Sequence, residues 1–352
     1  MAYHACRNPL HCFVPPHVLE EVTRTTADTP LRDAAIDGIA AGAASRRSRI
    51  AFRALPIMAA IPSPTGKEKR RLVYNMKDRT APLPGSLLRQ EGDDPCGDEA
   101  ADEAYDGAGY TYDFYSQIFG RNSLDDNGMV VKSIVHYGQK VPNAFWDGEQ
   151  MLYGDGDGTL FLRFTKSPEV IGHELTHGVI QYESNLEYHD EPGALNESFA
   201  DVMALQVDQW YKGQNVSEAD WWIGGEILAP KVGAKGIRTL TVDLAYENNR
   251  YLGTDPQPKH MRDKYTGDRD YGGVHINSGI PNHAFYLVAT ELGGRCWERA
   301  GAIWYKAMRA LHPKSDFAHA AETTISIAQT DFGDGSAEHK AVKSAWHQVG
   351  VT

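Results

Sequence analysis

The chain has 352 residues, of which 41% are hydrophobic and 23% charged, and its formal net charge is −12. This composition is typical of a soluble globular protein, and the length suggests two domains with a small appendage. The acidic balance offers no basic excess to neutralise phosphates, and no apolar run reaches membrane-spanning length, so neither nucleic-acid nor membrane partners are expected.

The first residues, 1–60, differ from the rest of the chain. They combine the proline pair Pro15 and Pro16, a helix-like run over 34–44 and an arginine cluster over 46–49. Composition alone supports a removable prosegment and an ordinary flexible tail equally well, since mobile ends are common. No conventional signal peptide is visible. We therefore expect a cytoplasmic precursor, with secretion by an unconventional route as the alternative.

Four cysteines are scattered along the chain: Cys6, Cys12, Cys96 and Cys296. Their spacing fits no zinc finger, and no close pair suggests a redox motif. Free thiols in a reducing compartment are favoured over a disulfide between Cys6 and Cys12. None of the four is predicted to be catalytic.

Between about residues 72 and 164 the pattern favours β-strands, with candidates over 129–137 and 159–164. Eight acidic residues fall between positions 91 and 106, which predicts a solvated loop. The run Asn-Ala-Phe-Trp over 143–146 resembles an edge strand, which could bind an extended peptide through its backbone. An aromatic strand packed in the core is the simpler alternative.

His173 and His177 are four residues apart, with Glu174 directly after the first. A helix is predicted here, because Pro168 suits a first helical position and Glu169 suits the positive end of the helix dipole. On a helix the two imidazoles lie on one face and can share a zinc ion, with Glu174 beside the water that the zinc activates. A buried helix with two hydrogen-bonded histidines is the simpler alternative, since short motifs recur by chance.

A second predicted helix supplies the remaining zinc donor. Nineteen residues separate His177 from Glu197, which can be a third ligand and leave the fourth tetrahedral position open for water. Asp201 falls one turn after Glu197. Asp201 and Asn196 could accept hydrogen bonds from the second ring nitrogens of the two histidines. The pattern therefore predicts a catalytic zinc site.

The rest of the chain is predicted to be mainly helical, with helices over 192–210, 282–292, 297–310, 317–332 and 337–349. We therefore expect an α+β fold with a β-rich domain over 61–188, which includes the zinc helix, and a helical domain over 189–352. The zinc helix should lie in the cleft between these domains, where ligands commonly bind.

Four motifs, taken together, are similar to those of the thermolysin-like zinc metallopeptidases. They are the run His173-Glu174-Leu175-Thr176-His177, then Gly193-Ala194-Leu195-Asn196-Glu197 with Asp201, Gly272-Gly273-Val274-His275-Ile276-Asn277-Ser278-Gly279, and Asn143-Ala144-Phe145-Trp146. The resemblance runs from about residue 72 to the C-terminus and implies that family's two-domain fold. The run Pro-Pro-His-Val-Leu over 15–19 resembles the short prosegment of protealysin-type members, which favours a prosegment over a tail.

The resemblance implies a role for each matched residue. The metal and catalytic set is His173, His177 and Glu197 for zinc, Glu174 as general base, Tyr188 and His275 as oxyanion donors, and Asp270 to orient His275. The substrate-binding set is Asn143 and Ala144 for the substrate backbone and Arg238 for a substrate carbonyl. Tyr271 departs from the family pattern, because members commonly carry asparagine before this glycine pair.

The calcium ligands of the family are matched in part. Glu169, Asp208, Asp220 and Glu226 fall at positions that resemble calcium ligands. In contrast, residues 222 and 225 are tryptophan and glycine where members with a paired site carry carboxylates. The resemblance therefore implies one calcium ion.

The function implied is zinc-dependent hydrolysis of peptide bonds on the amino side of bulky apolar residues. The expected partners are peptide or protein substrates and the chain's own prosegment, acting as an intramolecular inhibitor or chaperone until self-cleavage before Leu72. Two other classes stay open: a zinc-stabilised binding protein without turnover, and a zinc hydrolase of non-peptide substrates. Glu174, Tyr188 and His275 argue against the first, since binding alone has no use for them.

Overall fold

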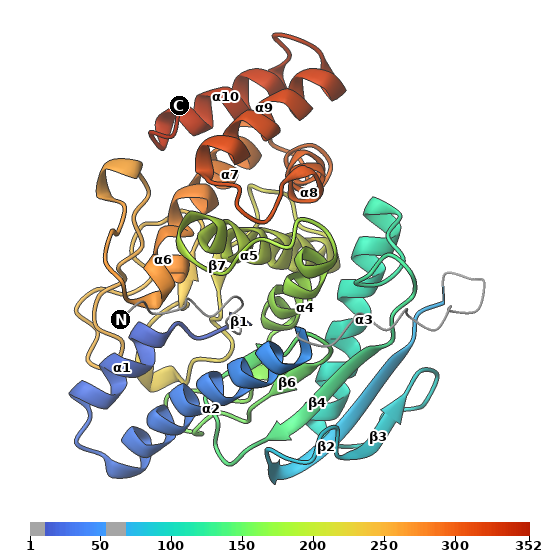
Figure 1. Cartoon of the computed structure of the whole chain (residues 1–352), viewed down its shortest axis with the longest axis vertical. Coiled ribbons are helices and arrows are strands. Elements are labelled where there is room, and N and C mark those ends of the chain that lie inside the picture. The colour runs from blue at the N-terminus through green and yellow to red at the C-terminus, as the bar shows by residue number, and fades with distance from the viewer. Residues whose placement is uncertain (1–10, 54–67) are drawn as a thin grey trace.

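The computed structural model describes residues 11–53 and 68–352, with side chains over 12–41 and 68–352. A β-rich half and a helical half meet along two central helices, α4 (Pro168–Tyr182) and α5 (Asp190–Lys212) (Figure 1). This arrangement confirms the expected α+β class. No helix in the described part of the chain combines the length and apolar content needed to cross a bilayer.

A six-stranded mixed sheet organises the β-rich half. Its strand order is β1-β5-β6-β4-β2-β3, and its strands are β1 (His11–Cys12), β2 (Arg71–Arg79), β3 (Ser86–Gln90), β4 (Val131–Tyr137), β5 (Ala144–Trp146) and β6 (Met151–Tyr153). Strand β4 is buried on both faces: Val131 and Val135 contribute to the main core, while Ile134 and Tyr137 pack in a smaller cluster on the opposite face. The short β7 (Trp222–Ile223) and β8 (Arg238–Thr239) form a separate pair.

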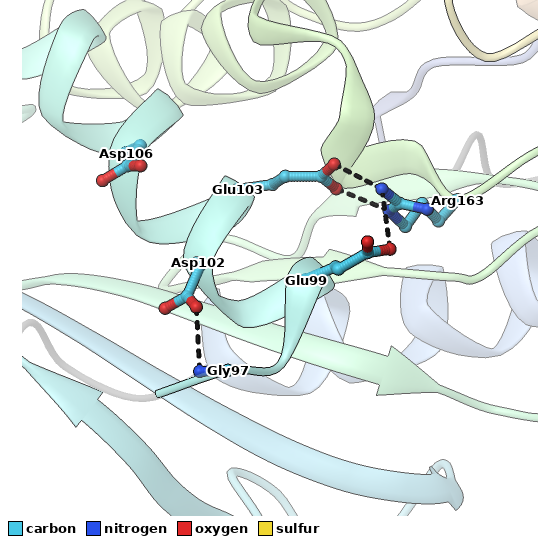
Figure 2. A pocket seen from close by; sticks show the side chains of 6 residues that line it. All are labelled: Gly97, Glu99, Asp102, Glu103, Asp106 and Arg163. Atoms are coloured by element: carbon cyan, nitrogen blue, oxygen red, sulfur yellow. Dashed lines mark hydrogen bonds and ion pairs between the residues drawn. The ribbon is translucent and has the colours of Figure 1, made fainter. Parts of the chain in front are cut away.

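The acidic stretch over 91–106 is an exposed loop over 91–98, as predicted, but its second half is helical, so the loop prediction is wrong for 99–106. Helix α3 (Glu99–Phe119) begins after Asp98, whose carboxylate accepts a hydrogen bond from the Ala101 N–H at 3.1 Å. Carboxylates in the first turn are favourable because they face the positive end of the helix dipole. Glu103 forms a two-pronged ion pair with Arg163, at 2.6 and 2.7 Å (Figure 2). The acidic residues thus cap and flank a helix whose other face is buried.

Helix α4 begins where the sequence predicts. The Ser167 hydroxyl accepts a hydrogen bond from the Val170 N–H at 3.3 Å, and Pro168 occupies the first helical turn. Almost the whole helix is buried. At Gly172 an added Cβ would lie 3.4 Å from the Ala204 Cα, so α4 and α5 approach closely at the turn that carries the first histidine. The missing side chain therefore lets the two helices bring their polar residues together.

The helical half contains the predicted helices with small shifts at their starts. The prediction over 192–210 corresponds to α5, and the others are α7 (Gly279–Leu292), α8 (Ala300–Ala310), α9 (Phe317–Phe332) and α10 (Ala337–Gln348). Helix α6 (Asp270–Asn277) was not predicted. The strand predicted over 159–164 is wrong, because this stretch is a loop with one isolated bridge between Phe161 and Leu228 and a 3-10 turn over Phe164–Lys166. Phe161 and Phe164 are buried there, so their apolar character reflects packing of a loop.

The N-terminal segment, defined here as residues 11–53, packs on both halves of the molecule (Figure 1). It contains β1, α1 (Pro16–Thr25) and α2 (Thr29–Arg53), and the helix-like run over 34–44 lies inside α2. Its apolar residues join the main core, among them Val18 and Leu19. The predicted boundary at residue 60 and Cys6 lie outside the described residues, and so do the side chains of the arginine cluster.

Candidate active site

Three donor atoms from α4 and α5 converge at the centre of the molecule. The Nε2 atoms of His173 and His177 lie 3.0 Å apart, and the Glu197 carboxylate oxygens lie 3.4 and 3.5 Å from them. A tetrahedral zinc ion with ligands at about 2.0–2.2 Å separates its donor atoms by roughly 3.3–3.6 Å, so the two nitrogen–oxygen distances fit and the two nitrogens lie slightly closer together. Within the described residues, this zinc triad is the one group of metal-binding side chains whose donors lie within 4.8 Å of one another. The triad therefore fits zinc.

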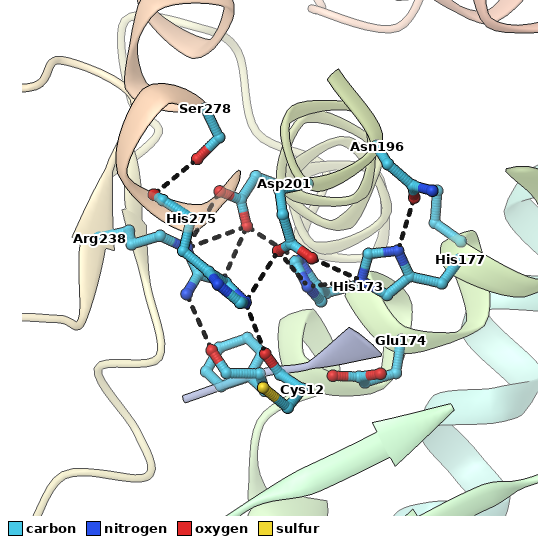
Figure 3. Close-up of polar contacts among 12 residues, drawn as sticks. Cys12, His173, Glu174, His177, Asn196, Asp201, Arg238, His275 and Ser278 are labelled. Atoms are coloured by element: carbon cyan, nitrogen blue, oxygen red, sulfur yellow. Dashed lines mark hydrogen bonds and ion pairs between the residues drawn. The ribbon is translucent and has the colours of Figure 1, made fainter. Parts of the chain in front are cut away.

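Each zinc-triad histidine is held by its other ring nitrogen. The Nδ1 of His173 lies 2.9 Å from the Asp201 carboxylate, and the Nδ1 of His177 lies 2.9 Å from the Asn196 amide oxygen (Figure 3). Burial acts to raise the pKa of Asp201, but Arg238 and His173 outweigh burial and hold this pKa below its ordinary value. An ionised acceptor fixes the tautomer in which Nε2 is free to bind metal.

Glu174 lies beside the zinc triad and is fully buried. One carboxylate oxygen, Oε2, accepts a hydrogen bond from the Trp146 N–H at 2.8 Å. The other, Oε1, has no hydrogen-bond partner within the described residues, so it can accept a proton from a water. Burial raises the pKa of Glu174 to about 8, near the neutral range where a general base is effective.

Two further groups, His275 and Tyr188, contact the Glu197 carboxylate of the zinc triad. Nδ1 of His275 lies 2.6 Å from Asp270, and its Nε2 lies 3.1 Å from the Tyr188 hydroxyl, which donates to Glu197. Burial acts to lower the pKa of His275, but the negative charges of Glu197 and Asp270 outweigh burial and raise this pKa well above its ordinary value. Burial also raises the pKa of Tyr188. Both groups are therefore protonated and can donate to a developing oxyanion.

A left-handed turn aims Asp270 at His275. Residues Tyr271, Gly272 and Gly273 have φ values of 53°, 82° and 81°, which reverse the chain so that the Asp270 carboxylate also accepts from the His275 N–H at 2.8 Å. A tyrosine rarely adopts positive φ, whereas asparagine and glycine do so readily. Replacement of the usual asparagine thus leaves this turn in place, with Tyr271 in a strained conformation.

The protein-family comparisons agree with this geometry. The catalytic domain of the thermolysin metallopeptidases matches residues 66–181, and the alpha-helical domain of the same family matches residues 184–351. The chain belongs to the thermolysin metallopeptidases. It is accordingly a thermolysin-like zinc metalloendopeptidase, which sets aside the non-catalytic binding protein and the hydrolase of non-peptide substrates.

Individual thermolysin metallopeptidases match most of the chain. An extracellular metalloprotease of Pectobacterium carotovorum subsp. carotovorum is 45% identical over 290 residues, which cover 82% of each chain. Protease PrtS of Photorhabdus sp. (strain Az29) is 46% identical over 285 residues, 80% of this chain and 76% of that protein. The structure of the precursor of protealysin, a metalloproteinase from Serratia proteamaculans, has a TM-score of 0.87 and 42% identity, and the match covers 97% of this chain and 100% of that one.

The residues predicted to bind the substrate of this thermolysin metallopeptidase contact the N-terminal segment. Ala144 accepts a hydrogen bond from the Phe13 N–H at 3.2 Å, and the Asn143 amide makes two hydrogen bonds to the backbone of Val14, at 2.8 and 3.2 Å. Arg238 donates to the Phe13 carbonyl at 2.8 Å and also holds Asp201. The segment thus lies along β5 and supplies β1 as the edge strand of the sheet, beside the zinc triad.

The four residues predicted to bind calcium, called the acidic cluster here, lie near enough for their charges to act to raise the pKa of Glu169 and Glu226, but their donor atoms are not as close together as those of the zinc triad. In the described part of the chain, the zinc triad is the one set of three or more metal-binding side chains whose donor atoms all lie within 4.8 Å of one another. Glu169 accepts from the Gly224 N–H at 2.8 Å, and Asp208 pairs with the ammonium of Lys212 at 2.8 Å. Burial raises the pKa of Glu169 to about 8 and raises that of Asp208. The other two members are Asp220 and Glu226.

Sequence reasoning missed several polar groups of this thermolysin metallopeptidase site. Asn282 donates to Asp201 at 2.9 Å, and Gln257 donates to the His275 carbonyl at 2.8 Å. Neither residue belongs to a sequence motif that indicates catalysis or metal binding, so no local signal could have identified it. The Trp146 N–H on Glu174 was also missed, although the edge-strand prediction placed that residue nearby.

Proposed function

We propose that this zinc metalloendopeptidase cleaves on the amino side of large apolar residues and is made as a precursor whose N-terminal segment fills the cleft. The observation that carries the proposal is Phe13. Its side chain is fully buried against the zinc-binding helix, with its ring centroid 5.3 Å from that of His173. Its backbone engages the same residues that are expected to bind a substrate.

The Phe13 side chain is enclosed by aromatic rings, a guanidinium and bare backbone. The Phe164 ring packs edge-on against it at 6.5 Å, and the Arg238 guanidinium lies 4.9 Å from its ring centre. At Gly224 an added Cβ would lie 2.9 Å from the Phe13 ring, so a bare backbone leaves room for the aromatic side chain. A pocket of this kind gains most free energy from a large apolar group, because more apolar surface is buried.

The residues around the zinc triad divide the chemistry of hydrolysis. When bound, zinc supplies a Lewis acid that polarises the scissile carbonyl and acidifies water. Glu174 takes the proton of the water and delivers it to the leaving amine. His275 and Tyr188 donate hydrogen bonds to the carbonyl oxygen as its charge grows, which typically contributes about 2.7–4 kcal/mol per donor. Arg238 holds the next carbonyl along the peptide in place.

A peptide library tests the substrate preference. Incubation of the activated enzyme with a mixture of peptides of varied sequence, followed by mass spectrometry, should show internal cuts that precede phenylalanine, leucine and similar residues. Cuts before alanine or glycine should be slower by a factor on the order of a hundred, because two or more buried methylene groups are lost. Cleavage confined to the chain ends would contradict the proposal and indicate an exopeptidase.

The N-terminal segment acts as an intramolecular inhibitor in this proposal. Support comes from its position in the cleft and from the match to a precursor of protealysin. Val18 is buried in the core, whereas Ile36 on the same segment is 46% exposed. Val18→Asp should loosen the segment and raise the initial rate on a quenched peptide, while Ile36→Asp serves as the matched control. Equal initial rates for both variants and the wild type would remove the inhibitory role.

Two further parts of the proposal concern calcium and destination. One calcium ion at the acidic cluster must displace the Lys212 ammonium from Asp208, whose Oδ1 has no hydrogen-bond partner within the described residues.

We also propose release of the protein from the cell by an unconventional route after synthesis as a cytoplasmic precursor. The relative from Pectobacterium is named an extracellular metalloprotease, which supports export, and fractionation of the producing cells tests it.

A further inference from the structure

The N-terminal segment lies in the cleft in the orientation of a substrate. Strand β1 is antiparallel to β5, with Cys12 opposite Phe145. The backbone groups of Phe13 and Val14 form hydrogen bonds with residues expected to bind substrate. The Phe13 N–H donates to the Ala144 carbonyl, and the Phe13 carbonyl accepts from Arg238. Both backbone groups of Val14 bond to the Asn143 amide. An inhibitor that merely covered the cleft would have no need of this complete set of backbone contacts.

The position of the Cys12 carbonyl fixes which peptide bond faces the catalytic groups. Its oxygen accepts a hydrogen bond from Nε2 of His275 at 3.0 Å. The same Nε2 lies 3.6 Å from Glu197, a member of the zinc triad. Since His275 is the expected oxyanion donor, the carbonyl that it contacts occupies the position of a scissile carbonyl. The side chain that follows, Phe13, fills the apolar pocket beside His173.

We infer that the bond between Cys12 and Phe13 is a processing site, which the enzyme cuts in its own N-terminal segment from within the cleft. This inference rests on the proposed function. The cut is distinct from the removal expected before Leu72, because it lies inside the docked part of the segment. It splits β1 from α1, so the strand that pairs with β5 is detached from the helix that anchors the segment.

The reaction consumes one water and needs no other reactant. The water oxygen bonds to the carbonyl carbon of Cys12 while Glu174 takes its first proton. The carbon–nitrogen bond between Cys12 and Phe13 then breaks, and the nitrogen of Phe13 receives that proton. The products are a carboxylate on Cys12 and an amine on Phe13, which leaves as an ammonium after taking up the second proton. A charged end beside the apolar pocket weakens the remaining segment, because burying an unpaired charge is unfavourable.

Mass spectrometry of the zinc-loaded full chain tests the inference. Samples taken over a day should accumulate a species that begins at Phe13, and Glu174→Gln should not form it. Phe13→Asp should slow formation on the order of a hundredfold or more, because a carboxylate does not fit the pocket. Cys12→Ala is the matched control and should be cut as the wild type is, since the Cys12 side chain packs in the smaller cluster with Met76 and Phe145.

A second measurement does not depend on turnover. In the metal-free chain, hydrogen exchange should show the amides of Phe13 and Val14 protected, and Asn143→Ala should remove the protection at Val14. Activity on an unrelated peptide separates the two ideas. If that peptide is cut while every species keeps an intact bond between Cys12 and Phe13, the inference is overturned and the endopeptidase stands. Unprotected Phe13 and Val14 amides would likewise overturn it.

Discussion

The zinc triad and the acidic cluster both draw carboxylates from α4 or α5, yet their arrangements differ. In the triad the donor atoms lie 3.0–3.5 Å apart, and the outer nitrogens of the histidines are held by Asp201 and Asn196. In the acidic cluster the ammonium of Lys212 lies against Asp208. Helical spacing predicts a metal site reliably when most donors share two packed helices. In the acidic cluster, helical spacing relates only Glu169 and Asp208 to the packed helices, because Asp220 and Glu226 lie in loops.

The largest expected effect is loss of the metal itself. His177→Ala should remove one of three donors, so stoichiometric zinc and all measurable peptidase activity should disappear together. Metal analysis of the purified variant checks this directly. Retention of one zinc per chain would show that the triad is not the zinc site, and the contrast between the triad and the acidic cluster would no longer hold.

Glu174→Gln should separate metal binding from chemistry. The amide is nearly isosteric with the carboxylate but cannot take a proton, so kcat/KM should fall on the order of 10³-fold. Zinc content should stay at the wild-type level, since Glu174 is not a ligand. A variant that keeps half of the wild-type rate would exclude this residue as the base.

The acidic cluster is tested through its cation. Lys212→Met leaves the buried Asp208 carboxylate without its ion pair, and the free energy of unfolding should fall by about 1–3 kcal/mol. Millimolar calcium should restore much of this loss by supplying the missing positive charge. Lys306→Met is the control, because its pair with Asp331 is more exposed. Thermal unfolding with and without calcium measures both variants, and an unchanged melting temperature in Lys212→Met would contradict the expectation.

The smallest expected effect concerns His17, which, unlike the members of either cluster, forms no direct ion pair within the described residues. Burial lowers the pKa of His17 to about 4. The charge of Asp270 opposes this shift, whereas the positive charges of His275, Arg238 and Arg269 lower the pKa further. The Nε2 of His17 lies 3.4 Å from the Tyr246 hydroxyl. The docked state therefore binds fewer protons than the released one. Docking is favoured above pH 6.5 and is weakened as the pH falls from 6.5 towards 4.

The rate at which activity appears measures this pH dependence. Between pH 7 and pH 5 the equilibrium for release of the N-terminal segment should rise on the order of tenfold in the wild type. His17→Gln, which cannot be protonated, should show a flatter profile over the same range. A steep profile in that variant would assign the effect to another group.

The sequence allowed the zinc triad to be predicted because its three donors sit on two consecutive helices. Their spacing alone put His173 and His177 on one face. The same local rules failed where long-range packing decides. The first two turns of helix α3 were predicted to be a loop, because their acidic residues alternate with the alanines of the buried face. The stretch over 159–164 was read as a strand, since loop residues can also be apolar.

The occupant of the cleft could not be predicted from local patterns either. Phe13 and Cys12 are separated from β5 by more than 130 residues of chain, and no periodicity links the two. Pro15 and Pro16 indicated a prosegment, but only the fold places the residues before them on the substrate-binding strand. Arg238, predicted to bind a substrate carbonyl, contacts the Phe13 carbonyl and Asp201 at once.

That double contact makes Arg238 a thermodynamic link between peptide and metal. Its guanidinium binds a peptide carbonyl and also pairs with Asp201, and Asp201 in turn holds the imidazole of His173. Coupling free energies are reciprocal. A peptide that orders the guanidinium should therefore slow the escape of zinc, and zinc should in turn tighten the hold on the peptide. The precursor, which supplies its own ligand, should exchange its metal more slowly than the processed enzyme does.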